Sequence, residues 1–227
     1  MAFRVDERAT ELREIDRFEG GAGWLAHPEE TMQRASHALV ADGEVWVTDP
    51  VDAEGLDDLL ESLGEVAGVV VGTDRHTRDA AAIARRHGAH VYLPEFFDGV
   101  AEDLEAPIVR FGDELADTGL EVRTLHDSRF WREVALFDPE RGTLVVPESL
   151  GTAPYFLAGG ERLGVHPMLR PVPPREQLRG LRPERILVGH GEGVLRDAPE
   201  ALETALSGAR RRTPRLYAES LWRFLPV

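Results

Sequence analysis

Residues 66–79 read Val-Ala-Gly-Val-Val-Val-Gly-Thr-Asp-Arg-His-Thr-Arg-Asp. The run from Val66 to Val71 is apolar on both of its faces, which is typical of a strand buried on both sides of a sheet. A polar loop follows this strand directly, and the alanine-rich residues 77–87, closed by Gly88, predict a helix with a glycine cap. A strand, a polar loop and a helix in this order predict an α/β fold with functional groups at the carboxyl end of the strand.

The residues around this stretch continue the alternation of strands and helices. Residues 36–40 and 44–48 predict a hairpin that turns at Asp42-Gly43. Residues 53–63 place four leucines on one helical face, and residues 90–93 predict a further strand. This order of elements predicts parallel strands that are joined by right-handed crossovers.

From about residue 108 the pattern changes to strands joined by tight turns. The predicted strands are residues 108–111, 120–125, 134–137 and 143–146, and the last two form a hairpin through residues 138–142. A short helix near residues 174–180, a strand at 185–188 and helices near 197–211 and 214–224 complete the chain. No repeat or low-complexity linker divides the sequence, so we expect one α/β (α+β) domain over residues 1–227, with helices outside mixed sheets.

The composition excludes several classes of protein. The chain has 41 acidic and 26 basic side chains, a net charge of −15, and no cysteine. Without cysteine there is no disulfide framework, iron–sulfur site or cysteine nucleophile, and the negative charge argues against nucleic acid as a partner. No apolar run approaches the roughly 20 residues that span a bilayer, and the N-terminus lacks a signal peptide, so we expect a soluble, cytoplasmic protein without a membrane partner.

All 26 basic residues are arginine, and the sequence contains no lysine. An acidic surface of this kind stays hydrated in a salt-rich cytoplasm, where the repulsion between its carboxylates is screened. We therefore interpret the protein as halophilic. A G+C-rich coding sequence is the alternative explanation for the choice of arginine.

Four loops that follow predicted strands contain the candidate functional residues. They are residues 48–50 with Asp49, residues 72–79 with Asp74, His76, Arg78 and Asp79, residues 147–149 with Glu148, and residues 189–193 with His190. Each residue also has a purely structural interpretation: Asp74 as a helix N-cap, Asp49 as a turn former, His76 as a polar contact and Glu148 as a solvated loop acid. His190 is the hardest to dismiss, because a glycine on each side allows close approach of another backbone.

These loops, over roughly residues 36–195, resemble the metallo-β-lactamase-fold superfamily. The signature of that superfamily is a strand ending in Asp, then a buried strand followed by Thr-His-x-His-x-Asp-His opening a helix. A third His, a bridging Asp after a hairpin strand and a late Gly-His-Gly complete it. The resemblance implies a four-layer αββα sandwich with one or two metal ions at the strand ends. It also implies a hydrolase of an ester, thioester, amide or phosphodiester bond.

The metal-ligand motif of this sequence is degenerate. Asp49 matches the Asp that ends the first strand, and His76 and His190 match two of the histidines. The substituted positions are Asp74 for the first His, Arg78 for the Asp, Asp79 for the last His and Glu148 for the bridging Asp. His126 lies in the region of the third His but lacks its usual Pro-Gly context, so its role as a ligand is open. We interpret the histidines at 27, 37, 87, 90 and 166 as surface or core residues, and the four tryptophans as core or pocket wall.

Arg78 decides how many metal ions the resemblance allows. Two unit charges about 4 Å apart interact by roughly 4 kcal/mol at an effective dielectric near 20, so an inward-pointing Arg78 would repel a divalent ion by roughly 8 kcal/mol. A structural zinc site supplies only about 10–16 kcal/mol. We therefore expect no second metal ion, and a guanidinium in its place that is paired with Asp79 or Glu148.

One divalent metal ion is still compatible with the motif. The resemblance implies Asp74, His76, Glu148 and His190 as its ligands, with zinc the best fit and manganese or iron as alternatives. Asp79 or Glu148 would then accept the proton of a water acidified by the metal. If the site is fully degenerate, no metal binds.

Two main functions follow. The first is a hydrolase-like protein with an altered, at most single-metal site, acting on a small ester or thioester. The second is a non-catalytic member of the superfamily whose Arg78-filled cleft binds a ligand or partner. A third, weaker hypothesis makes Arg75 and Arg78 a site for a phosphate or carboxylate. In each case we expect a small-molecule ligand. Leu216, Leu221, Trp222 and Phe224 of the last helix could face the core or a second subunit of a homo-oligomer.

Overall fold

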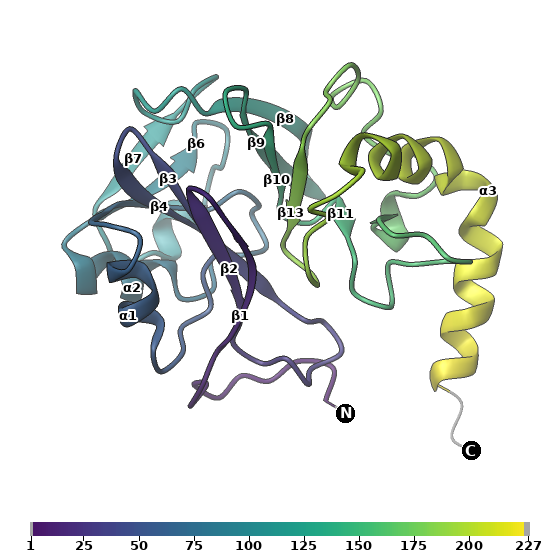
Figure 1. Cartoon of the computed structure of the whole chain (residues 1–227), viewed down its shortest axis with the longest axis horizontal. Helices are drawn as coiled ribbons and strands as arrows, with labels where there is room; N and C mark the ends of the chain where they lie inside the picture. Colours follow the sequence, from purple (N-terminus) through teal and green to yellow (C-terminus); the bar gives the residue numbers. More distant parts are fainter. Residues whose placement is uncertain (1, 225–227) are drawn as a thin grey trace.

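The predicted buried strand forms β5 (Val66–Val70) inside a seven-stranded sheet. This computed structural model describes residues 2–224, without the side chains of residues 103 and 220–224 (Figure 1). The sheet has the strand order β1 to β7, with β1 (Arg13–Phe18), β2 (Gly21–Leu25), β3 (Ala35–Ala41), β4 (Glu44–Thr48), β6 (His90–Pro94) and β7 (Ile108–Phe111). Strands β1 to β4 are antiparallel, and β4 to β7 are parallel. The predicted hairpin and parallel crossovers are confirmed.

Two helices cover the outer face of this sheet, α1 (Leu56–Glu61) and α2 (Ala80–His87). Leu56, Leu60 and Ile83 are fully buried in one apolar cluster with strand residues such as Val47 and Val69. The predicted leucine face is therefore the face that packs on the sheet. Burial of this face removes apolar surface from water, which stabilises the folded state by roughly 25 cal/mol per Å² of apolar surface buried.

The second sheet has four strands in the order β13-β10-β9-β8. They are β8 (Glu121–Ser128), β9 (Trp131–Asp138), β10 (Thr143–Val146) and β13 (Arg185–Val188). The helix α3 (Ala198–Phe224) packs its alanines and leucines on the outer face of this sheet, and the inner faces of the two sheets share a third apolar cluster. The layers are helix, sheet, sheet and helix, which is the predicted αββα sandwich.

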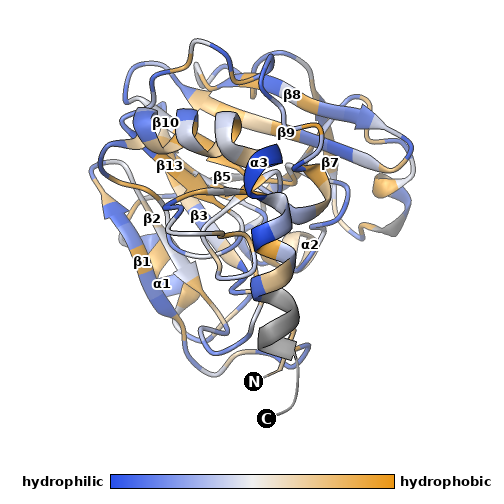
Figure 2. Cartoon of the chain, turned by 90° about the vertical axis from the view of Figure 1, so that its right-hand side faces the viewer, coloured by the Kyte–Doolittle hydropathy of each residue, from blue (hydrophilic) through white to orange (hydrophobic). Residues whose placement is uncertain are grey.

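Figure 2 shows hydrophilic as well as hydrophobic residues along β1 and β8, which are edge strands of the two sheets. A segment with little regular structure connects β10 to β13. It contains β11 (Leu150–Gly151), β12 (Gly164–Val165) and the short 3₁₀ turn η2 (Pro167–Leu169); a similar turn, η1 (Val100–Asp103), precedes β7. Within residues 2–224, no helix combines the length and apolar character that crossing a membrane requires.

Two helix predictions near the C-terminus are wrong. Residues 175–180 form turns that end at Gly180, whose φ of +80° lies in the left-handed region. The expected break before Pro214 is absent, and α3 runs through it as one helix. Leu216 is only 1% exposed, so it faces the core; the side chains of Leu221, Trp222 and Phe224 lie outside the described residues.

A buried ion pair ties the irregular segment to α3. Arg170 Nη2 lies 2.5 Å from Glu161 Oε2, and both side chains are fully buried. Arg212 of α3 donates to the other carboxylate oxygen, Glu161 Oε1, at 3.1 Å. Glu161 is thus shared by two arginines, and its loss would leave a buried guanidinium uncompensated.

We predict that Glu161→Gln destabilises the protein by about 3 kcal/mol, because removing one partner of a buried ion pair leaves a charge unpaired. Denaturant unfolding measures the change. Glu176→Gln is the control, since Glu176 pairs with Arg179 at an exposed site. Equal stabilities of the two variants would contradict the role of Glu161.

Candidate metal centre

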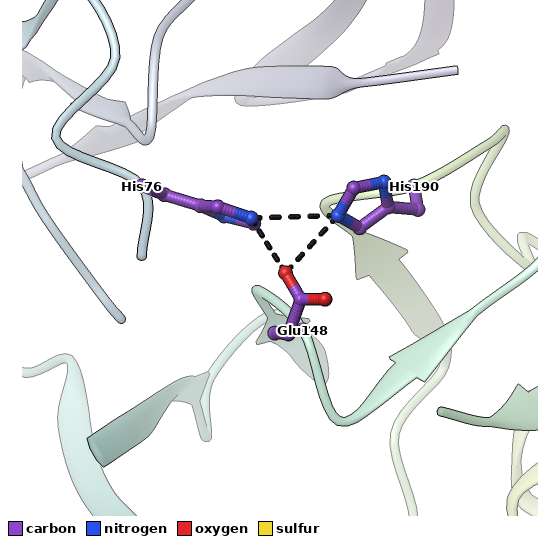
Figure 3. A group of neighbouring side chains, drawn as sticks. All are labelled: His76, Glu148 and His190. Atoms are coloured by element: carbon purple, nitrogen blue, oxygen red, sulfur yellow. Dashed lines mark hydrogen bonds and ion pairs between the residues drawn. The ribbon is translucent and has the colours of Figure 1, made fainter. Parts of the chain in front are cut away.

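Three loops bring their functional side chains together at one end of the sandwich. Glu148 and His190 each lie two residues beyond the paired strand ends Val146 and Val188 of the parallel strands β10 and β13. His76 comes from the loop between β5 and α2. Figure 3 shows the three side chains pointing toward one another. The structure therefore brings together three of the four ligands that the motif predicts.

The three side chains form a tight triangle. Glu148 Oε2 lies 2.5 Å from His76 Nε2 and 3.1 Å from His190 Nε2, and the two imidazole nitrogens are 3.4 Å apart. All three residues are buried. Burial alone would raise the pKa of Glu148, but the electrostatic contacts and hydrogen bonds with His76 and His190 hold it well below its usual value.

The glycines on both sides of His190 allow the loops to approach this closely. A Cβ atom on Gly189 would lie 2.1 Å from the carbonyl oxygen of Pro147. A Cβ on Gly191, which has a φ of +92°, would lie 2.3 Å from Thr152 Oγ1. Since no side chain fits at either position, only glycine lets the His190 loop lie against the Glu148 loop.

The hydrogen bond at the far side of His190 fixes its tautomer. Nδ1 lies 2.9 Å from the carbonyl oxygen of Met32, so it carries the proton and donates. In the neutral ring Nε2 is then an acceptor, and it faces the acceptor Glu148 Oε2. Two buried acceptors in contact require a proton or a cation between them. The donor set of two imidazoles and a carboxylate fits a zinc ion in that place.

Arg78 makes different contacts from those predicted. Its Nη1 donates to the carbonyl oxygens of Ala35 and Asp49, both at 2.7 Å, and its Nη2 donates to that of Gly189 at 3.2 Å. Among the side chains that the structure describes, no carboxylate forms an ion pair with it, so the expected pairing with Asp79 or Glu148 is wrong. Backbone carbonyls hold the guanidinium instead, because the first residue of β3 and two loops present them at this point.

The Arg78 guanidinium also lies next to His76. Nη2 is 3.4 Å from His76 Nε2. Burial, with the positive charge of Arg78, lowers the pKa of His76 to about 3, so its imidazole is neutral at pH 7. Burial lowers the pKa of Arg78 to about 10, so the guanidinium stays charged. The site therefore has a fixed cation beside a neutral histidine.

Asp49 joins two of the loops. Its Oδ1 accepts the amide of Gly72 at 3.0 Å, and its carbonyl oxygen accepts from Arg78. Burial raises the pKa of Asp49 from 3.8 to about 7, even though Arg78 opposes this. Asp49 is thus a structural tie whose side chain is protonated in weakly acidic solution.

Asp74 and Asp79 lie outside the triangle. The group of ligand atoms that lie within 4.8 Å of one another contains His76, Glu148 and His190, and neither aspartate. Asp79 Oδ2 accepts the amide of Asp52 at 2.8 Å, and Asp74 Oδ1 is buried without a hydrogen-bond partner. Because α2 begins at Ala80, Asp74 is not its N-cap. A ligand role for Asp74 and a proton-acceptor role for Asp79 stay predictions.

His126 is separated from the site, and His166 is close to it. His126, on β8, is also outside the group of clustered ligand atoms, and its ring packs 6.1 Å from that of Trp131. The other side of the site contains His166, whose Nε2 lies 3.4 Å from Glu148 Oε1. Interpreting His166 as a mere surface or core residue overlooked this contact. The irregular sequence around it gives no signal of where the chain returns to the site.

Glu133 is the second residue that the sequence analysis missed. Its fully buried carboxylate accepts the amides of Glu148 and Ser149, at 2.8 and 2.7 Å, the Trp131 indole at 2.9 Å, and the Ser149 hydroxyl. Burial raises the pKa of Glu133 to about 7. Glu133 thereby fixes the backbone that presents Glu148.

Comparisons with known proteins give structural matches alone. No family model matches the sequence, and no curated protein matches it either. A crystal structure of DIM-1 metallo-β-lactamase exposed to ceftazidime is 12% identical, with a TM-score of 0.59, over 94% of this chain and 100% of that one. TMB-1 is 15% identical, with a TM-score of 0.58 and the same coverage. The metallo-β-lactamase FIM-1 from Pseudomonas aeruginosa, in its mono-zinc form, is 10% identical, with a TM-score of 0.56, over 92% and 99%.

We predict that Asp49→Asn becomes more stable relative to wild type as the pH rises from about 4 to 7. The native state keeps the Asp49 proton up to about pH 7, whereas the unfolded chain releases it near 3.8. The free energy of unfolding of wild type therefore falls over this window by up to about 4 kcal/mol because of Asp49, whereas the Asp49→Asn variant lacks this loss.

Denaturant unfolding in EDTA at several pH values measures this difference. Exposed Asp117 provides the control variant, Asp117→Asn, which should follow the pH dependence of wild type. A constant stability difference between Asp49→Asn and wild type would show that Asp49 is ionised throughout.

Proposed function

In this chain, which has the metallo-β-lactamase fold, we propose that His76, Glu148 and His190 bind one divalent metal ion. The protein is then a metal-dependent hydrolase with an altered site, acting on a small ester or thioester. The observation that carries the proposal is the contact between His190 Nε2 and Glu148 Oε2, two acceptors 3.1 Å apart in a buried site. A shared metal ion satisfies both of them.

The donor set supports zinc, with manganese or iron as alternatives. Two neutral imidazoles and one carboxylate, with a fourth position open, are the ligands of many catalytic zinc sites. The Nδ1–H of His190 donates to a backbone carbonyl, which is how proteins orient a metal-binding histidine. Asp74 is not included in the proposed ligand set, because its carboxylate lies outside the cluster.

Arg78 supports a single metal ion rather than two. Its charged guanidinium is held by three carbonyls next to His76, where a second cation would be repelled. With Glu148 ionised, the charges of Glu148 and Arg78 cancel before any metal binds. A first divalent ion then leaves the site with a net positive charge, which would repel a second one.

The residues of the chain have separate roles in the proposed reaction. When bound, a divalent ion acts as a Lewis acid that polarises a carbonyl group and acidifies water. Glu148 is the one candidate proton acceptor inside the cluster, and its Oε1 is turned away from both imidazoles that contact Oε2. The rings of Tyr155 and Phe156 pack 5.9 and 5.6 Å from that of His190, which is fully buried beside them.

One observation favours the non-catalytic alternative. A pocket of about 260 Å³ opens beside Arg78, lined among others by His27, Arg34, Asp52 and Asp79. In this alternative a proton bridges Glu148 and His190, no metal binds, and the pocket receives a small ligand or a partner. An anion site built by Arg75 and Arg78 has less support, because Arg78 already donates to three carbonyls and Arg75 to Phe130. A cytoplasmic location and adaptation to high salt stay predictions from composition.

We predict about one equivalent of zinc per chain in protein purified without added metal, and loss of that zinc in His76→Ala and His190→Ala. Elemental analysis measures the metal content. His90→Ala is the control, because His90 is exposed at the start of β6. A wild-type content below a tenth of an equivalent would overturn the metal site, and two equivalents would overturn the role given to Arg78.

We further predict that the zinc-loaded protein hydrolyses an activated acetate ester or a thioester. The kcat/KM of His76→Ala and of His190→Ala should each be at least a hundredfold lower than that of wild type. A melting temperature that EDTA leaves unchanged, together with no hydrolysis of either substrate, would favour the non-catalytic alternative.

A further inference from the structure

His166 reaches the carboxylate of Glu148 from the side opposite to the two proposed histidine ligands. It follows β12 and precedes η2. Its Nδ1 accepts the amide of Met168 at 3.2 Å, so the proton of the neutral ring is on Nε2. The Nε2 atom lies 3.4 Å from Glu148 Oε1, within ion-pair distance of it. The two oxygens of one carboxylate therefore have different partners: Oε1 faces a donor, and Oε2 faces His76 and His190.

Packing keeps the His166 ring in this orientation. The ring lies edge-on to Trp131, with centroids 4.9 Å apart, and to Phe156 at 5.4 Å. Its side chain is 14% exposed. Trp131 in turn contacts His126 on its other side and donates its indole N–H to Glu133. The aromatic residue thus separates His126 from the site and supports His166 within it.

Glu148 needs such a partner more than an aspartate would. A glutamate has one more rotatable bond, and fixing it costs side-chain entropy. Glu133 holds the backbone amide of Glu148, and the two proposed histidine ligands contact only one oxygen of its carboxylate, Oε2. A donor on Oε1 holds the other oxygen as well.

We propose that His166 is the positioning residue of the metal centre: its Nε2–H holds Glu148 Oε1, so that Oε2 stays directed at the metal ion. This inference rests on the proposed metal site. Partners of this kind, one contact away from the metal, typically contribute 10–100-fold to metal affinity.

Zinc competition with a chromophoric chelator tests the inference in three variants. His166→Phe and His166→Met keep an apolar side chain of similar bulk but lose the N–H, and we expect each to bind zinc 10–100-fold more weakly than wild type. His166→Gln keeps an N–H donor at a comparable reach, and we expect an affinity within about threefold of wild type. Denaturant unfolding of the metal-free proteins shows which variants fold.

The cobalt-substituted proteins give a second readout that packing alone would not change. We expect the visible absorption of the Co²⁺ form to shift in His166→Phe and His166→Met, and to be kept in His166→Gln. A folded variant without the N–H that binds zinc within twofold of wild type and keeps the cobalt spectrum would overturn the role of His166 alone. Wild-type protein that binds no zinc would instead overturn the metal site, and this inference with it.

Discussion

The site depends on one contact: two hydrogen-bond acceptors, His190 Nε2 and Glu148 Oε2, face each other in a buried hollow. Several separate parts of the fold contribute to that contact. The parallel pairing of β10 with β13 places the two loops side by side, the glycines at 189 and 191 let them touch, and the Met32 carbonyl sets the histidine tautomer. Such a contact is costly unless something positive lies within it, and a metal ion or a proton is the available choice.

Arg78 makes this site different from a two-metal centre. Its guanidinium is a permanent charge that needs no cofactor, and three backbone carbonyls neutralise much of its cost of burial. Burial and the charge of Arg78 together keep His76 neutral, which suits a ligand, while Arg78 disfavours a further cation nearby. The same residue thus supports one metal ion and opposes a second.

The strands and helices that carry the site and the loops of the site could be predicted from the sequence, because they depend on periodic apolar patterns and on residues at strand ends, whereas the four layers were implied by the family resemblance. The valines before Gly72 and the leucines of residues 53–63 are such patterns, and His76, Glu148 and His190 each follow a strand.

Other features have no local signature. Glu133 precedes the predicted strand at 134–137 by one residue, and His166 lies in a segment without periodicity. The partners of Arg78 are carbonyl oxygens, which every residue has, so the pairing with Asp79 was the natural and wrong expectation. The sequence predicts a break in the helix before Pro214, because proline removes one backbone hydrogen bond. The burial of Leu216 on the following turn outweighs that loss, and α3 continues.

An anomalous-difference map, from crystals grown without added metal and measured above the zinc absorption edge, tests the central claim most directly. The account predicts a single peak in contact with His76 Nε2, Glu148 Oε2 and His190 Nε2. An empty triangle in a well-ordered crystal would mean that a proton bridges the two acceptors and that the metal centre does not exist.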